Sequence, residues 1–405
     1  MSPPRVDVAP TGSPPPAESG LPSGWEPAVL VGATLLILCF GLVNLYSASA
    51  FLAQRQGLPD TYYVLRQTAG AAGGLILMVA ASRVPYGWWR ALAWPLVAGS
   101  WLVLVFMILP WTGELAPEIN GARRWLDMGV TIQPSEFAKL AVIIWTAHIA
   151  VKKQDAFRSL SRGLLPFLLI WGLILIPVLL QPDLSTAFVI GMLGALVVFA
   201  AGARIGHFVF LSILLAPLAL AQLGTGFRQD RMLAFQDVAG HAAAAGYQAH
   251  QSLVALGSGG ALGVGFGEGR QKFGFLPEPH NDFIFSMIGE EWGLLGAGFL
   301  IVAFLLIVVV GFRIARSAPD LFGQLLAIGI TNLIALHAVL HMGVGLGLLP
   351  PTGLPLPLVS YGRSNLLVIL IGVGILLAVA RGSVDLARAG SGTGSRIRSA
   401  MGVGA

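Results

Sequence analysis

Ten long apolar segments constrain this chain more than any other feature of its sequence. They lie near residues 27–49, 64–83, 88–110, 134–151, 163–181, 184–203, 206–223, 283–311, 323–349 and 360–380. Each is close to the roughly 20 residues that a helix needs to cross about 30 Å of hydrocarbon. Charged residues make up 11% of the chain, against about 25% in soluble domains. The sequence therefore predicts an all-α polytopic membrane protein with about ten transmembrane helices.

The distribution of Lys and Arg predicts the orientation of these helices. Basic residues collect in alternate connections and in the C-terminal tail, at Arg83, Arg90, Lys152, Lys153, Arg158, Arg162, Arg204, Arg313, Arg316, Arg381, Arg388, Arg396 and Arg398. Cytoplasmic loops of membrane proteins are enriched in these residues, so both termini are expected in the cytoplasm. The extracytoplasmic side then carries one loop at about 111–133 and a longer one at about 224–281, between helices 7 and 8. The basic pI is explained by this topology, and no aromatic–basic module points to nucleic acid.

Three segments follow along the chain. Residues 1–25 are rich in Pro, Ser and Gly and are expected to form a disordered cytoplasmic tail without a cleavable signal peptide. Residues 26–382 form the transmembrane domain, and residues 383–405 form a basic cytoplasmic tail. A single cysteine, Cys39, excludes a disulfide framework or a thiolate metal cluster. The glycine-dense stretch 257–272 lacks dinucleotide-binding spacing, and either packs against the helix ends or takes a direct role.

Two short outer segments place acids at helix starts. In TIQPSEFAKL, Glu136 lies in the first turn of a helix and shares a face with Lys139, three residues on. The two are either an ion pair at the helix start or part of a functional cavity. Asp183, in the turn QPD, either caps the next helix or faces the same cavity.

Basic, aromatic and hydroxyl residues complete the outer candidates. Arg123 and Arg124 could bind phosphate or lipid headgroups, and Trp125 beside them is either a cavity residue or an interfacial anchor. Lys272 lies in the long outer loop. Ser360 lies in the proline-rich connection GLLPPTGLPLPLVSYGRSN, where no suitably adjacent His or Asp supports a serine-hydrolase mechanism.

The stretch LPEPHNDFIFSMIGEEWG holds the most unusual acids. Asp282 sits where polar sequence becomes apolar, so it is either a helix cap or a working group in a cavity. Charged groups at membrane depth are costly and mark functional sites by default. Glu290 and Glu291 lie two turns further on and are expected either to face a polar interior or to find partners, with His337 and His341 as candidates. No set of His, Asp and Glu here has metal-ligand spacing, so no metal site is predicted.

Five ordered motifs resemble those of the SEDS family, which includes FtsW, RodA and SpoVE. They read GARRWLDMG with QPSEFAKL, then QPDLSTA, GYQAHQSLVALGSGG, LPEPHNDFIFSMIGEEWG and TGLPLPLVSYG. The resemblance covers nearly everything after the N-terminal tail. It implies a peptidoglycan glycosyltransferase that polymerises lipid II at the outer face of the bacterial cytoplasmic membrane. It also implies a class B penicillin-binding protein as partner, with other divisome or elongasome membrane proteins.

The resemblance carries roles onto particular residues. The acid that the family requires for activity falls on Asp282, which is the candidate general base. The family's outer cavity is expected to include Glu136, Lys139, Asp183 and Trp125. Positive charge for the leaving pyrophosphate would come from Lys139 or from the outer basic residues Arg123, Arg124, Arg231, Arg270 and Lys272, or from a divalent cation, Mg or Mn.

The sequence departs from the family pattern near its last loop and ninth apolar segment. Arg363 and Asn365 replace Gly and a small residue, and His337 and His341 stand where Gln and Asn are common. The proline loop and the N-terminal tail favour a division-type member over an elongation-type one. A lipid II flippase is the alternative function, although the polar groups gather at one face rather than at the midplane. A scaffold that recruits a transpeptidase would leave the buried acids without a purpose.

Overall fold

The computed structural model describes residues 24–119, 121–223, 231–232, 235–236, 240 and 246–400. The helices are α1 Glu26–Arg55, α2 Tyr62–Arg83, α3 Trp88–Ile108, α4 Pro134–Lys152, α5 Leu165–Leu180, α6 Leu184–Ala200, α7 Ile205–Leu223, α9 Tyr247–Gly259, α10 Ile284–Arg316, α11 Leu321–Gly345 and α12 Arg363–Ala400. Short helical turns are η1 Pro110–Thr112, η2 Gln154–Arg158, η3 Leu160–Leu164 and η4 Gln271–Phe273. Strands β1 Leu126–Asp127 and β2 Thr131–Ile132 form a small antiparallel hairpin.

Each of the ten apolar segments forms a helix, which confirms the all-α membrane class. Within the described residues, seven helices are long and apolar enough to cross a membrane, and Leu184–Ala200 is a shorter apolar helix. Large apolar side chains on the outer faces of α1, α2 and α3, including Leu36, Ile76 and Leu102, are exposed. Lipid tails would cover such surfaces. The expected 1–25 tail lies almost wholly outside the described residues, and α12 continues to Ala400, beyond the predicted end of the last apolar segment.

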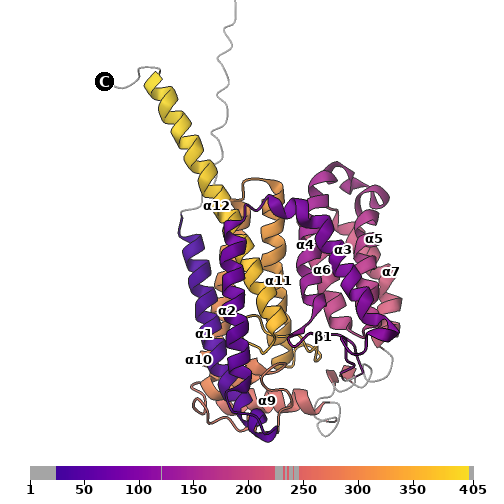
Figure 1. Cartoon of the computed structure of the whole chain (residues 1–405), viewed down its shortest axis with the longest axis vertical. Helices are drawn as coiled ribbons and strands as arrows, with labels where there is room; N and C mark the ends of the chain where they lie inside the picture. Colours follow the sequence, from indigo (N-terminus) through magenta and orange to yellow (C-terminus); the bar gives the residue numbers. More distant parts are fainter. Residues whose placement is uncertain are drawn as a thin grey trace, which may run out of the picture.

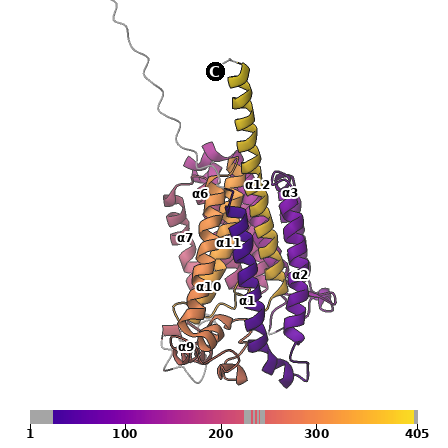
Figure 2. The ribbon, with the colours of Figure 1, turned by 90° about the vertical axis from the view of Figure 1, so that its left-hand side faces the viewer.

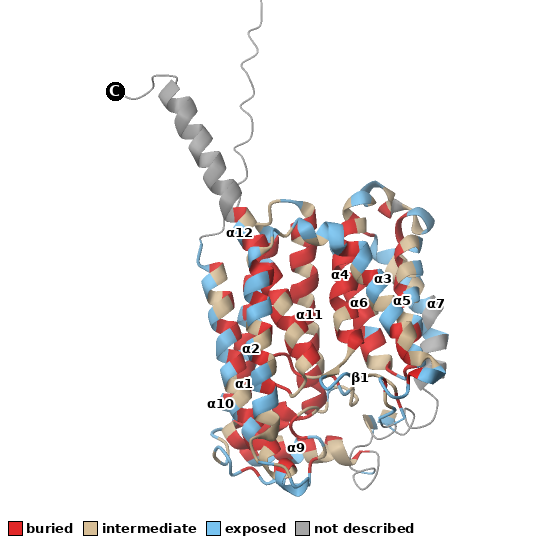
Figure 3. Cartoon of the chain, in the orientation of Figure 1, coloured by how far each residue is buried: buried red, intermediate tan, exposed pale blue. Residues whose placement is uncertain are grey.

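The helices form two groups that meet at the centre (Figure 1). Helices α1, α2 and α10 lie on one side, α3, α5, α6 and α7 lie on the other, and α4 and α11 pack together between them. Helix α12 packs along α2 and also contacts α4. The most deeply buried side chains are on α4, α11 and the bundle part of α12 (Figure 3). Because α4, α11 and α12 lie at the centre, the polar residues that they carry are held within the bundle.

The connections at one end of the bundle are longer than those at the other. Helix α9, η4 and the hairpin lie at that end, and α12 projects from the opposite end (Figures 1 and 2). The predicted extracytoplasmic loops 111–133 and 224–281 both belong to the end that carries α9, as far as the described residues show. The candidate site is therefore built where several loops converge on the central helices.

Helix α10 is broken by the glycine-rich loop that precedes it. Gly293 has φ 63° and ψ −155° inside the helix, a conformation open to glycine because it has no Cβ. The amides of Val264 and Gly265 donate to the carbonyls of Glu290 and Glu291 at 3.0 and 3.1 Å. A break at this depth must be satisfied by other backbone groups, and the loop supplies them. The glycine-dense stretch therefore packs against the broken part of α10. This agrees with the first of its two interpretations, that it packs against helix ends.

Candidate active site

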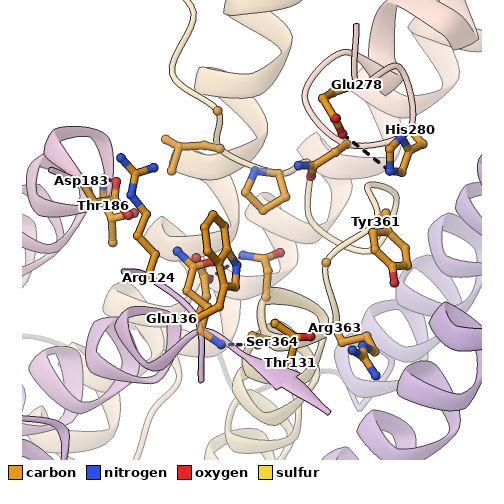
Figure 4. Close-up of a pocket in the computed structure, with 18 of the residues that line it drawn as sticks. Arg124, Thr131, Glu136, Asp183, Thr186, Glu278, His280, Tyr361, Arg363 and Ser364 are labelled. Atoms are coloured by element: carbon orange, nitrogen blue, oxygen red, sulfur yellow. Dashed lines mark hydrogen bonds and ion pairs between the residues drawn. The ribbon is translucent and has the colours of Figure 1, made fainter. Parts of the chain in front are cut away.

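A polar cavity of about 330 Å³ opens at the end of the bundle that carries the long loops. This volume is at the lower end of the range for small-molecule sites. Helices α2, α4, α6 and α12, the hairpin and two loops contribute side chains to it (Figure 4). Its lining includes Arg66, Arg124, Trp125, Thr131, Gln133, Glu136, Asp183, Thr186, Glu278, His280, Asn281, Thr352, Gly353, Leu354, Pro355, Tyr361, Gly362, Arg363, Ser364 and Asn365.

The floor of the cavity is a buried polar network around Glu136 and Lys139. Their predicted pair is confirmed: Lys139 Nζ donates to Glu136 Oε1 at 2.6 Å, and the side chains are 0% and 2% exposed. Lys139 Nζ also lies 3.0 Å from His337 Nε2. Asn365 Nδ2 donates to Glu136 Oε2 at 2.9 Å and lies 3.1 Å from His337 Nδ1. Two of the residues that depart from the family pattern therefore complete this network.

The turn between α5 and α6 forms one wall. Asp183 Oδ1 accepts the amide of Thr186 at 3.1 Å, so the carboxylate caps α6 and also lines the cavity. Asp183 is therefore both the helix cap and the cavity residue that its sequence offered as alternatives. Arg124 donates to the carbonyl oxygens of Gln181 and Pro182 at 3.2 and 2.5 Å, which fixes its guanidinium beside the turn.

The arginines of the hairpin segment have different surroundings. Arg124 and Trp125 line the cavity. Arg123 points away from it, donating to Leu109 O at 3.3 Å, with Glu118 Oε2 3.9 Å from its Nε. Figure 4 shows Arg124 beside Asp183 on one side of the cavity, and Arg363 and Tyr361 on the other. Positive charge thus enters the cavity from two opposite walls.

Asp282 occupies a neighbouring, smaller cavity. It lines a space of about 20 Å³ together with Arg231, Gln248, Phe283, His341, Val344 and residues 351–354. Thr352, Gly353 and Leu354 line both cavities, so this segment separates Asp282 from the larger one. The Oδ2 atom of Asp282 faces Gly353, and lies 3.8 Å from the position that a Cβ on Gly353 would take.

The structure contradicts the interpretation of Asp282 as a side-chain cap. The residue that precedes α10 is Phe283, and no side chain caps that helix. The pKa of Asp282 is raised to about 6, chiefly by burial and also by the nearby Glu278, while Arg231 lowers it. Desolvation disfavours the ionised form of a carboxyl group, and here it outweighs the opposing effects. Burial likewise lowers the pKa of His280, on the cavity wall, to about 4.

Lys272 and Ser360 lie outside both cavities. Lys272 Nζ donates to Glu291 Oε1 at 2.9 Å, to Ser47 Oγ at 3.0 Å and to Gly267 O at 2.6 Å. Ser360 Oγ accepts the amide of Leu356 and donates to the carbonyl of Asn281. These contacts fasten the outer loops to each other and to the bundle.

Glu290 and Glu291 have partners, as expected, but these are not the candidate histidines of α11. Glu291 pairs with Lys272, and Glu290 accepts the backbone amides of Arg270 and Gln271 at 2.8 and 3.3 Å. The loop before α10 supplies the partners of both acids, Lys272 and two backbone amides, so neither acid needs a partner from α11.

Arg66 is a cavity residue that sequence reasoning missed. It lies on α2, where its guanidinium carbon sits 4.7 Å from the centroid of the Tyr62 ring. A lone arginine near a helix start is ordinary in sequence, and no motif marks it. Arg363, noted as a departure from the family pattern, lies close to the same helix, with its side chain against Gly70.

Taken together, the central cavity and the helical bundle define a membrane protein with an acid-containing polar site at one end, and comparison with known proteins gives its family. The family described as "Cell cycle protein", FtsW/RodA/SpoVE, matches residues 28–384. The chain belongs to this family.

Individual relatives and solved structures agree with this membership. The chain is 39% identical to the "Probable peptidoglycan glycosyltransferase FtsW" of Geobacter metallireducens, over 87% of this chain and 93% of the relative. It is also 39% identical to the "Stage V sporulation protein E" of Bacillus subtilis, over 87% and 96%. A structure described as "Structural coordination of polymerization and crosslinking by a peptidoglycan synthase complex" superposes with TM-score 0.72 at 30% identity, over 87% and 97%. The rod shape determining protein RodA of Thermus thermophilus gives 0.63 at 30% identity, over 87% and 95%.

Proposed function

We propose that this chain is a peptidoglycan glycosyltransferase that polymerises lipid II into glycan strands in cell division or cell-shape maintenance. The observation that carries the proposal is Asp282, a buried carboxyl group with a pKa raised to about 6. It lies beside a polar cavity into which arginines project. The family, and the names of relatives that share about 39% of their residues, support the same activity.

We place the cavity at the outer face of the bacterial cytoplasmic membrane. In this arrangement all ten apolar helices cross the membrane, and both termini lie in the cytoplasm. The enrichment of Lys and Arg in the connections at the end opposite the cavity supports it. Lipid-linked sugars would enter the cavity from the outer leaflet, with their headgroups level with Glu136 and Asp183.

In the proposed reaction, a sugar hydroxyl of one lipid-linked chain attacks the anomeric carbon of another. A new carbon–oxygen bond forms as the bond to the lipid pyrophosphate breaks. Asp282 takes the hydroxyl proton, because a general base works best when its pKa is near the operating pH, and such groups contribute about 10²–10⁴-fold. Arg124, Arg363 and Arg66 supply positive charge to the leaving pyrophosphate, since guanidinium groups bind phosphate through paired hydrogen bonds.

The position of Asp282 imposes a condition on this mechanism. Because residues 352–354 lie between Asp282 and the larger cavity, the reacting hydroxyl reaches the carboxyl only if this segment moves. Gly353, in the middle of this segment, has φ 68°. Because glycine has no side chain, only backbone separates the two cavities at this point. We propose that bound substrate displaces the segment and meets the Oδ2 atom that faces it.

The partner we propose is a class B penicillin-binding protein, within the divisome or the elongasome. A structural neighbour described as a peptidoglycan synthase complex that coordinates polymerization and crosslinking supports it. A divalent cation, Mg or Mn, was the other expected participant. The described residues contain no group of three or more His, Cys, Asp or Glu that could hold a metal ion, so a cation here would be held between the substrate pyrophosphate and one or two carboxylates, beside the arginines.

The proposal is tested with purified protein and labelled lipid II in detergent, alone and with its transpeptidase partner. We expect glycan strands from the wild-type chain and none from Asp282→Asn, which removes the base without changing side-chain size. Asp320→Asn is the matched control. Asp320 caps α11 at the opposite end of the bundle, and Asn is an equally good cap. Wild-type polymerisation by Asp282→Asn would overturn the mechanism. Absence of polymer from the wild-type chain in detergent, together with transport of lipid II in reconstituted vesicles, would favour a flippase.

A further inference from the structure

Two buried polar atoms without a hydrogen-bond partner belong to residues that line the same small cavity. They are Oδ1 of Asp282 and Nε2 of His341, both shut off from solvent and unpartnered among the described residues. Buried polar atoms are nearly always paired, with protein or with ordered water. Leaving one unpaired costs free energy comparable to a lost hydrogen bond. Two such atoms, on residues from different elements that line one cavity, point to a shared partner.

The state of the His341 ring follows from its other nitrogen. Nδ1 lies 2.8 Å from the carbonyl oxygen of Leu354, and a carbonyl oxygen only accepts. Nδ1 therefore carries the hydrogen, so that Nε2 of the neutral ring is left as an acceptor. The ring is 2% exposed, and its orientation is fixed by the loop that also separates Asp282 from the larger cavity.

The size of the cavity selects the partner. A volume of about 20 Å³ holds about one water molecule, for which 10–15 Å³ is roughly the minimum. A water can donate one hydrogen to a carboxylate oxygen and the other to an imidazole nitrogen. We propose that this cavity is a site for one structural water that bridges Asp282 Oδ1 and His341 Nε2, so that His341 positions the water that sets the basicity of Asp282.

Other charged groups surround this pair. Glu278, on the loop before Asp282, and Arg231, from the long outer loop, act on the carboxyl in opposite directions. His337 lies one turn from His341 on α11, and Lys139 contacts it from α4. Helix α9 contributes an uncharged residue, Gln248, to the lining of the cavity. Within this set, His341 is the group that lines the cavity with Asp282 and offers an acceptor to a bridging water.

The water bridge gives the two oxygens of the Asp282 carboxyl group different roles. This step rests on the proposed function, in which Asp282 is the general base. Oδ1 holds the water, and Oδ2 faces Gly353, in the segment that separates Asp282 from the larger cavity where the substrate would lie. The hydrogen bond from water favours the ionised form, which offsets part of the desolvation that raises the pKa of Asp282. His341 is thus a positioning residue that keeps the base ionised near neutral pH.

The test compares pH profiles of polymerisation for three proteins, from pH 5 to 9. His341→Phe fills the same space without ring nitrogens, whereas His341→Gln offers an amide oxygen near the position of Nε2. We expect the acid limb of kcat to lie about one pH unit higher in His341→Phe than in the wild type. That shift corresponds to about fivefold less activity at the pH of the wild-type midpoint. His341→Gln is expected to restore the limb.

Activity at high pH separates this role from a structural one. At pH 8.5 Asp282 is ionised in all three proteins, so His341→Phe should regain nearly wild-type kcat. An unshifted limb in His341→Phe would overturn the proposal, as would a loss at pH 8.5 equal to that at pH 6.

Infrared titration gives a readout that does not need turnover. The carboxyl stretch of Asp282, identified by subtracting the spectrum of Asp282→Asn, should titrate at a higher pH in His341→Phe than in the wild type. Equal titration midpoints would refute the bridge even if the variant is inactive. Activity in Asp282→Asn would instead refute the proposed function, so the two failures are distinguishable.

Discussion

Lys272 was predicted from sequence to contact substrate, and its surroundings predict a structural role that mutation can test. Its ammonium group has three hydrogens to donate, and Glu291, Ser47 and Gly267 accept all three within 3.0 Å. No donor remains for a phosphate. Lys272→Met should therefore affect the stability of the protein before it affects the chemistry.

The expected size of the effect follows from the burial of the pair. Lys272 and Glu291 are 7% and 2% exposed, so removing the lysine leaves a buried carboxylate with one remaining side-chain donor, Ser47, at 2.6 Å. Breaking a buried ion pair in this way costs about 3–5 kcal/mol of unfolding free energy. The glycine-rich loop should also loosen at the break in α10, since this pair is one of the contacts that join the two.

Chemical unfolding in mixed micelles measures the free energy, and limited proteolysis of the 257–272 loop reports its loosening. Arg270→Met is the matched control, because Arg270 is an exposed basic residue of the same loop. Surface changes of this kind usually stay within about 0.5 kcal/mol. The double variant Lys272→Met with Glu291→Leu should recover most of the lost stability, since an apolar pair can replace a buried ionic one.

Two results would refute this reasoning. Wild-type stability in Lys272→Met together with lost lipid II binding would make Lys272 a substrate ligand after all. Additive losses in the double variant would show that Lys272 and Glu291 are not coupled.

Two further predictions concern the acid residues. The pKa of Asp282, raised to about 6 from its ordinary 3.8, means that the fold binds this proton more tightly than the unfolded chain does. The stability that it contributes is full below about pH 4 and lost as pH rises through 6. Asp282→Asn should therefore be more stable than wild type by about 3 kcal/mol at pH 7.5 and by much less at pH 4 in unfolding titrations. Asn365→Leu should lower the unfolding free energy by about 1.5–3 kcal/mol, because the hydrogen bond from Asn365 to the charged Glu136 is lost. The same change in a Glu136→Gln background should cost clearly less, and equal costs would contradict the coupling.

Local sequence rules recovered the helices and some of their ends. Pro134 and Glu136 mark the start of α4, and Asp183 caps α6 as the turn predicted. The pair between Glu136 and Lys139 also follows from spacing, because residues three apart on a helix share a face. These features need only neighbours within one turn, so the sequence contains the whole of the relevant information.

Contacts between distant segments were not readable in this way. Glu291 finds Lys272, 19 residues earlier in the chain, because the glycine-rich loop enters α10 at Gly293. Asn365 and His337, on different helices, complete the network of Glu136. Arg66 enters the cavity from α2 without any motif to mark it. Each depends on where a helix or loop is placed in the bundle, which residue order alone does not give.

The apolar segments by themselves determined that this chain is a helical membrane protein, because backbone groups in hydrocarbon must pair within their own segment. The ordered motifs identified the family and singled out Asp282. The tertiary structure decided what that acid faces: a thin loop wall towards the larger cavity on one side, and His341 across a water-sized space on the other. The physical reason is burial, since the pKa of a carboxyl group is set by the groups that replace water around it, and folding brings those groups from α11 and the outer loops.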